Sequence, residues 1–454
     1  MMGVTLAGGW TQSQARGEIS QERENPGPFP RTDQSIARRT PLAPRRRHWR
    51  GDCIAPQLAM EAHELKDGRR KTALVLSGGG ARAAYQVGVL RGLRDLGVLS
   101  TGFDVLVGSS AGSINASALA AHAGDLDTAV AALERVWGNL EVGQVFRTDI
   151  RSLGTIGARW AWDLTFGGAF GHVTPKALLD TSPLRKLLEK AIPFKQIEAN
   201  IEKGTLQALA VAATDLCTAE GVLFLHTHGD VSLWQRRRWQ MQRVQIRVDH
   251  VLASSAVPIF FPSVAIDGRH LGDGCIRNTA PLRPAINLGA DRIVAIGVRG
   301  TRSAAKPALK APPSIAQIAG VLLDAVMMDS IEGDVEHAEH VNTGLVTSSD
   351  GPRGPFRWID VLWIQPSGDV GAIAAELEER IPNIVRYLMR GLGTDEALIE
   401  LASYLLFDAA FCGRLIELGR ADVAAARDRI ETFFATTAEK NQLDADNRAM
   451  AQTA

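Results

Sequence analysis

Three short segments of this sequence hold residue types that can carry out acyl transfer. The first, Gly108-Ser-Ser-Ala-Gly112, has the pattern G-x-S-x-G and lies between an apolar run and a run of small residues. In this pattern the glycines permit a sharp turn from strand to helix, and the central serine is exposed at the sheet edge in a strained conformation. The segment therefore predicts Ser110 as a nucleophile in a turn formed by Gly108 and Gly112. A plain turn or a helix-capping serine is the alternative.

The second segment, Gly78-Gly-Gly-Ala-Arg82, follows another short apolar run. Backbone without side chains lets N–H groups approach a substrate oxygen closely, so we expect Gly78, Gly79, Gly80, Ala81 and Arg82 to form an oxyanion hole. Gly78-x-Gly80-x-x-Ala83 also fits a dinucleotide-binding fingerprint. That fingerprint requires an acidic residue at the end of the next strand, but Asp104 falls near the start of it. The P-loop pattern is absent.

The third segment supplies a candidate base. Asp273 follows an apolar strand pattern and is flanked by Gly272 and Gly274, which permit a tight approach to another loop, although Asp-Gly is also common in plain turns. A histidine base is the alternative, and His270 is the nearest candidate, inside a predicted strand or hairpin. Other histidines belong to no recognisable motif, among them His172, His226, His228, His250, His337 and His340.

Alternating strands and helices must position these segments. Strands are predicted at 72–77, 103–107, 206–214, 221–226, 292–298 and 359–365, and helices at 248–255 and after each glycine segment, ending near Gly97 and Ala123. The pattern indicates an α/β domain with a mostly parallel sheet covered on both faces. Beyond about Val370 the pattern is helical, with helices predicted at 372–380, 383–392, 395–418 and 421–434.

The composition changes sharply along the chain. Residues 1–70 are rich in Gly, Ser, Gln, Pro and Arg without apolar periodicity, which predicts a disordered basic tail, and Met60 is a second candidate start of translation. We predict a catalytic domain at 71–370, a helical extension at 371–440 and a flexible tail at 441–454.

The whole-chain numbers exclude some classes of protein. Lys plus Arg and Asp plus Glu each total 50 of 454 residues, so charge gives no argument for a nucleic-acid partner. The 4 cysteines are far apart, as expected for reduced thiols in a cytoplasmic protein. No apolar run reaches the ~18–20 residues of a membrane-spanning helix. We therefore expect a cytoplasmic protein, with contact to a membrane from one side at most.

Taken together, the three segments resemble those of the patatin-like phospholipases. That family combines G-G-G-x-[RK], G-x-S-x-G and D-G-[GA] in this order, and Ala253–Pro262 is similar to its S-A-x-P…F-P segment. The resemblance spans about Thr72 to Val298, with Cys275 at the position where the family prefers Gly or Ala. It implies a three-layer α/β/α sheet, to which the C-terminal helices are not assigned.

The resemblance also implies a mechanism and a substrate class. Ser110 and Asp273 would form a dyad without histidine, an acyl-enzyme would form, and the Ala111 N–H would join the oxyanion hole. The implied substrates are lipid acyl esters, with no cofactor, no metal and no nucleic acid. Two apolar segments have open roles: Trp160, Trp162, Phe166 and Phe170 could form a lid or acyl channel or ordinary core, and Ile315–Met328 could lie on a bilayer or be buried.

Two other functions remain open on the sequence. One is a non-catalytic lipid-binding or regulatory relative, which would have no use for a strained serine turn. The other is a carboxylesterase or thioesterase with a histidine-based triad.

Overall fold

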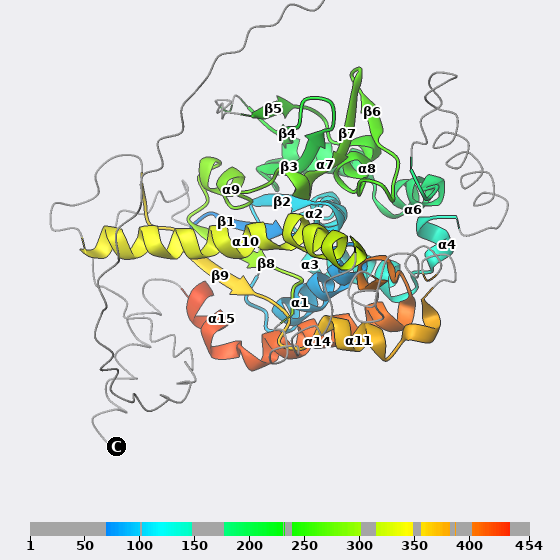
Figure 1. The fold of residues 1–454 in the computed structure, drawn as a ribbon. Coiled ribbons are helices and arrows are strands. Elements are labelled where there is room, and N and C mark those ends of the chain that lie inside the picture. Colours follow the sequence, from blue (N-terminus) through cyan, green and yellow to red (C-terminus); the bar gives the residue numbers. More distant parts are fainter. Residues whose placement is uncertain are drawn as a thin grey trace, which may run out of the picture. The chain divides into compact units, whose positions relative to one another are not determined.

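The described residues form one nine-stranded sheet (Figure 1). Its strands are β1 (Thr72–Leu76), β2 (Val105–Ser109), β3 (Ala208–Asp215), β4 (Glu220–Thr227), β5 (Trp239–Arg243), β6 (Val264–Ile266), β7 (Arg269–Asp273), β8 (Arg292–Ile296) and β9 (Asp360–Ile364). The computed structural model describes residues 70–99, 102–147, 177–229, 231, 238–300, 315–347, 356–381, 386 and 402–435. The predicted tails at 1–70 and 441–454, apart from Arg70, and the aromatic residues at 160–170 lie outside these ranges.

The centre of the sheet is parallel. The strand order is β5-β4-β3-β2-β1-β8-β9, and β3, β2, β1, β8 and β9 all run in the same direction. Strands β4 and β7 both pair antiparallel with β3, and β6 forms a hairpin with β7. Because β1 and β2 are parallel neighbours, the loops that follow them emerge side by side at the carboxyl ends of the strands. This is the arrangement that the glycine loop and the serine turn require.

Helices cover both faces of the sheet, as predicted. In β1, Leu74 and Leu76 belong to one buried cluster, and Ala73 and Val75 belong to another on the opposite face, because successive side chains of a strand alternate between faces. The first cluster is shared with α1 (Ala84–Asp95), α2 (Ala111–Ala121), α3 (Leu126–Gly138) and α14 (Ala409–Ala425). The second is shared with α9 (Arg283–Asn287) and α10 (Ile315–Thr347). The fold is a three-layer α/β/α sandwich.

Shorter helices complete the domain. They are α4 (Val142–Val145), α6 (Ser182–Ala191), α7 (Phe194–Glu202), α8 (Val248–Ser254), α11 (Val370–Ala375) and α15 (Arg427–Phe434), with 3₁₀ turns at Gly80–Ala83, Gly274–Ile276 and Glu378–Arg380. The helix that we predicted at 383–392 lies outside the described residues except for Arg386. The structure confirms a helix at Ile315–Met328, where it forms the start of α10. Almost all of the side chains that would decide between a bilayer and a buried position lie outside the described residues.

The C-terminal helices differ from the prediction in their bounds. The predicted helix at 395–418 is interrupted, since the chain is not helical at 406–408. Helix α14 then spans Ala409–Ala425, with Asp408 as its N-cap, and continues through the break that was predicted at 418–421. The helix passes Gly419 because this glycine lies against α1, where a Cβ would be 2.5 Å from the Tyr85 carbonyl oxygen. Figure 1 shows α14 beside α1. The predicted domain bounds, 71–370 and 371–440, stay predictions.

Candidate active site

Ser110 occupies a strained turn between β2 and α2. It is the N-cap residue of α2, with φ 52° and ψ −130°, a conformation that costs an L-residue free energy. Three serines hold it there. The Ser110 N–H donates to Ser254 Oγ at 3.0 Å, and the Ser110 carbonyl accepts from Ser113 Oγ at 2.6 Å and from Ser255 Oγ at 3.2 Å. The turn therefore has the backbone geometry expected of a nucleophile elbow.

The two glycines of the turn lie where side chains would collide. A Cβ on Gly112 would be 2.5 Å from the carbonyl oxygens of Leu76 and Ser77, and a Cβ on Gly108 would be 2.6 Å from the Gly112 carbonyl oxygen. Strand β2 extends to Ser109, two residues beyond the predicted end at Val107, because Gly108 is accommodated in the strand opposite Leu76. The sharp turn thus begins only at Ser110.

Gly78 brings the three sequence segments together. A Cβ at this position would lie 2.8 Å from Ser110 Cβ and 2.3 Å from Cys275 Sγ. The glycine loop, the serine turn and the Asp273-Gly-Cys275 segment therefore meet at one point. Any side chain at position 78 would push them apart.

Asp273 is completely buried at the end of β7 and is held by its main chain. Its N–H donates to the Ala256 carbonyl at 2.9 Å, and its own carbonyl accepts from Thr214 Oγ1 at 2.8 Å. In the side chain, Oδ1 accepts from the Cys275 N–H at 2.9 Å. Oδ2 has no partner of full hydrogen-bond geometry among the described residues. The carboxyl group is thus fixed in place with one oxygen open.

The surroundings of Asp273 favour its protonated form. Burial raises the pKa of Asp273 from 3.8 to about 6, because the carboxylate loses its hydration. Hydrogen bonding from Ser110 and from Cys275 acts in the opposite direction on this pKa. The Ser110 hydroxyl is therefore close enough to influence the carboxyl group, and a base with a pKa near 6 is suited to work near neutral pH.

An apolar pocket opens beside Ser110. Gly80, Ala111 and Ser255 are its small lining residues near the serine. The rest of the lining is apolar or aromatic: Ile114, Trp137, Val145, Leu184, Val257, Phe260, Phe261, Tyr404, Leu405 and Phe407. Such a lining fits an aliphatic chain and offers little to a charged or sugar-like group.

The predicted oxyanion residues have different surroundings. Gly80 and Ala111 line the pocket with Ser110, whereas a Cβ on Gly79 would be 2.4 Å from Val298. Ala81 is buried in the 3₁₀ turn that begins at Gly80. The Arg82 side chain contacts a distant segment, with Nε donating to Ser403 Oγ at 2.7 Å and the guanidinium 4.1 Å above the Tyr404 ring. Their role at an oxyanion stays a prediction.

No histidine of the described ranges bonds to Ser110 or Asp273. His270 Nδ1 lies 3.3 Å from Ser263 Oγ, His226 accepts from the Ile246 N–H, and His250 accepts from the Arg247 N–H. His172 lies outside the described residues. Within those ranges, no group of three His, Cys, Asp or Glu could hold a metal ion, and no helix is long and apolar enough to cross a membrane.

Several residues of the site were not found from the sequence. Ser254 and Ser255 lie in a segment that the resemblance covers, but no pattern predicted that they hold Ser110. Asn278 Nδ2 donates to Ser109 Oγ at 2.7 Å beneath the turn. Tyr404, Leu405 and Phe407 lie in a segment that we predicted as plain helix. An available signal was Asp408, an N-cap residue type directly before Ala409-Ala-Phe.

Comparison with known proteins identifies the matched region. Residues 74–286 match the family model of patatin-like phospholipases. No curated protein matches the chain. Among solved structures, VipD from Legionella pneumophila is 12% identical with a TM-score of 0.31, over 81% of this chain and 69% of that one. Human GIVD cytosolic phospholipase A2, in complex with methyl γ-linolenyl fluorophosphonate, is 12% identical with a TM-score of 0.35, over 80% of this chain and 59% of that one.

Proposed function

Because the chain carries a patatin-like phospholipase domain over residues 74–286, we propose that it is a lipid acyl hydrolase that cleaves carboxylic esters with a Ser110–Asp273 dyad. The observation that carries the proposal is the fixed, buried Asp273 carboxyl beside the strained Ser110, with Oδ2 open and the pKa near 6. The apolar pocket beside Ser110 supports an aliphatic acyl group as the part of the substrate that is recognised.

In the first chemical step Ser110 Oγ attacks the ester carbonyl carbon. Its proton passes to Asp273 Oδ2, while Oδ1 stays hydrogen-bonded to the Cys275 N–H and keeps the carboxyl oriented. The leaving alcohol then takes this proton, and an acyl-enzyme on Ser110 remains. In the second step Asp273 accepts a proton from water as the water oxygen attacks the acyl carbon. The bond to Ser110 Oγ then breaks, Oγ takes the proton back from Asp273, and the fatty acid is released.

The charge that develops on the carbonyl oxygen needs N–H donors. Ala111 is the first residue of α2, so its N–H has no partner within the helix and points out of the helix start. The glycine loop supplies further N–H groups on the side where Gly78 contacts the Ser110 side chain. Each such donor typically contributes ~10²–10³ in rate.

Two other functions have less support. A triad esterase needs a histidine near Ser110, and the described histidines that are nearly buried, His226 and His250, are engaged elsewhere. A non-catalytic lipid-binding protein gains nothing from the strained Ser110 or from an unpartnered buried carboxyl oxygen, both of which cost stability.

Ester hydrolysis by the purified protein tests the proposal. We expect release of p-nitrophenol from p-nitrophenyl octanoate, and release of fatty acid from micellar phospholipid. Ser110→Ala should lower kcat by at least about 10⁴-fold, because the covalent step is lost. Ser117→Ala is the matched control, since this buried serine also lies on α2, its hydroxyl has no hydrogen-bond partner among the described residues, and it does not contact the Ser110 turn; kcat should stay within about twofold of wild type. A folded Ser110→Ala variant that keeps its activity would exclude the proposed nucleophile.

A further inference from the structure

Residues Ala402–Phe407, which we call the C-terminal wall, contact the glycine loop directly. Gly80 has φ 56°, and a Cβ there would be 2.2 Å from the Tyr404 carbonyl oxygen. Arg82 is 1% exposed, donates to Ser403 Oγ at 2.7 Å and stacks on the Tyr404 ring at 4.1 Å. A buried guanidinium is costly unless its donors and its flat face are both used. Arg82 therefore joins the loop to a segment far beyond residue 286, where the family match ends.

The wall also forms one side of the apolar pocket. Tyr404, Leu405 and Phe407 line it together with Ser110. The Phe407 ring meets Phe146 edge-on at 6.3 Å between centroids, and the Phe146 ring is in turn 6.1 Å from that of Phe261. Because Tyr404 contacts Gly80 and Phe407 contacts Phe146, the wall extends from the glycine loop along the pocket.

Helix α14 fixes the position of the wall. Asp408 caps this helix by accepting from the N–H groups of Ala410 and Phe411, so the wall ends in a rigid element. Helix α14 is in turn held against α1, with Tyr85 Oη donating to Asp422 Oδ2 at 2.8 Å. Because α1 begins directly after the glycine loop, loop and wall are attached to the same pair of packed helices.

We propose that the C-terminal wall selects the acyl chain of the substrate and is locked to the oxyanion loop by Arg82. The proposal rests on the lipid acyl hydrolase function proposed above. A short acyl group at Ser110 meets the Tyr404 end of the wall, and a longer chain continues along Leu405 and Phe407. Arg82 acts here as a positioning residue, since its contacts are to the wall.

Acyl-chain selectivity tests the wall. The quantity is the ratio of kcat/KM for p-nitrophenyl octanoate to that for p-nitrophenyl acetate. Leu405→Ala and Phe407→Ala should each lower this ratio by about tenfold, because contact with the longer chain is lost. Ile430→Ala in α15 is the control: this side chain is also buried but does not line the pocket, so the ratio should stay within about twofold of wild type.

The lock has its own readout. Ser403→Ala removes the acceptor of Arg82 Nε and should lower kcat about tenfold on both esters with KM little changed, because oxyanion donors act in the transition state. Ser403→Thr keeps the hydroxyl and should restore kcat. If the role of Ser403 is purely structural, Ser403→Ala will lower the melting temperature but leave kcat unchanged at assay temperatures well below it. That result would contradict the proposed link between Arg82 and the wall.

The outcomes separate this proposal from the proposed function. If ester hydrolysis depends on Ser110 but the octanoate-to-acetate ratio is unchanged in both folded wall variants, the wall proposal is wrong and the acyl hydrolase stands. If the wild type shows no Ser110-dependent hydrolysis of either ester, the proposed function fails, and the wall proposal fails with it. Thermal unfolding confirms that each variant is folded at the assay temperature.

Discussion

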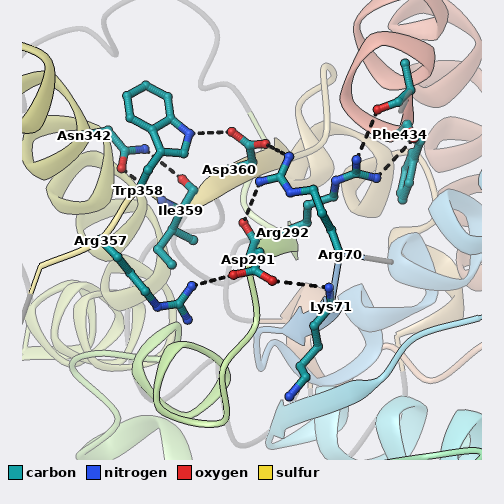
Figure 2. Close-up of polar contacts among 11 residues, drawn as sticks. Arg70, Lys71, Asp291, Arg292, Asn342, Arg357, Trp358, Ile359, Asp360 and Phe434 are labelled. Atoms are coloured by element: carbon teal, nitrogen blue, oxygen red, sulfur yellow. Dashed lines mark hydrogen bonds and ion pairs between the residues drawn. The ribbon is translucent and has the colours of Figure 1, made fainter. Parts of the chain in front are cut away.

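The aspartates at the two ends of the parallel strands differ in whether they form ion pairs. At the carboxyl ends, Asp273 has no salt bridge within the described residues, and its Oδ2 has no partner of full hydrogen-bond geometry there. At the amino ends, Asp291 pairs with Arg357 at 2.9 Å and Asp360 pairs with Arg70 at 2.6 Å (Figure 2). An unpaired buried carboxylate costs stability but can readily accept a proton. A carboxylate that is paired with an arginine stabilises the fold, and the ion pair disfavours its protonation.

The amino-end network connects elements that are distant in sequence (Figure 2). Arg292, at the start of β8, donates to the carbonyl oxygens of Phe434 and Ala435 at 3.1 Å each, which satisfies the end of α15. Asn342 of α10 exchanges two hydrogen bonds with the main chain of Ile359. This end of the sheet therefore ties β8, β9, α10 and α15 together, and its charges serve the fold.

Asp273→Asn should separate activity from stability most strongly. We expect kcat to fall about 10⁴-fold, because an amide cannot accept the Ser110 proton. The free energy of unfolding at pH 8 should rise by about 1–3 kcal/mol, because a buried charge is replaced by a neutral group. Ester assays and urea unfolding measure the two effects. Retained activity in the folded variant would mean that another group, such as a histidine, is the base.

Changes in pH should also move activity and the stabilising contribution of Asp273 in opposite directions. Below about pH 6 the rate should fall about tenfold per pH unit, because Asp273 becomes protonated as pH drops through its folded-state pKa. This pKa lies above the usual 3.8, so the stabilising contribution of the protonated carboxyl is complete below pH 3.8 and is lost as pH rises through about 6. The loss is about 3 kcal/mol in order of magnitude.

Subtracting the unfolding free energy of Asp273→Asn from that of wild type at each pH isolates this contribution from the other titrating groups. This difference, wild type minus variant, should fall between pH 4 and pH 6 and then level off. A difference that does not change over this interval would show that Asp273 is not titrating with a raised pKa.

Asp291→Asn should give the reverse of Asp273→Asn. It removes the carboxylate that Arg357 binds and leaves a half-buried cation without that partner, so the free energy of unfolding should fall by about 2–4 kcal/mol. At temperatures where the variant is folded, kcat should stay within about twofold of wild type, because the site lies at the other end of the strands. Adding Arg357→Met should recover part of the stability. A large loss of kcat in the folded variant would mean that the two ends are coupled.

The candidate site at the carboxyl ends of the strands was more predictable than its surroundings. The structure brings the predicted segments of Gly78, Ser110 and Asp273 together. They could be predicted because a sharp turn or a close approach restricts the residue types that fit, and this restriction is visible in a few consecutive letters. The wall was missed because Tyr404, Leu405 and Phe407 are ordinary apolar residues whose role arises only when α14 packs on α1. The amino-end pairs join residues as far apart as Arg70 and Asp360, and no local pattern specifies such partners.

Helix α14 links the two ends, and its glycines give the smallest and most specific test. A Cβ on Gly419 would lie 2.5 Å from the Tyr85 carbonyl oxygen and 2.8 Å from the Val89 nitrogen, whereas a Cβ on Gly413 meets nothing within 4 Å. Gly413→Ala should therefore raise the free energy of unfolding by about 0.5–1 kcal/mol, since alanine favours a helix. Gly419→Ala should lower it by about 1–3 kcal/mol, because α14 must move off α1. If both variants were stabilised alike in urea unfolding, the close contact of the two helices would be refuted. If only Gly419→Ala also changed the octanoate-to-acetate ratio, the position of the wall would depend on this packing.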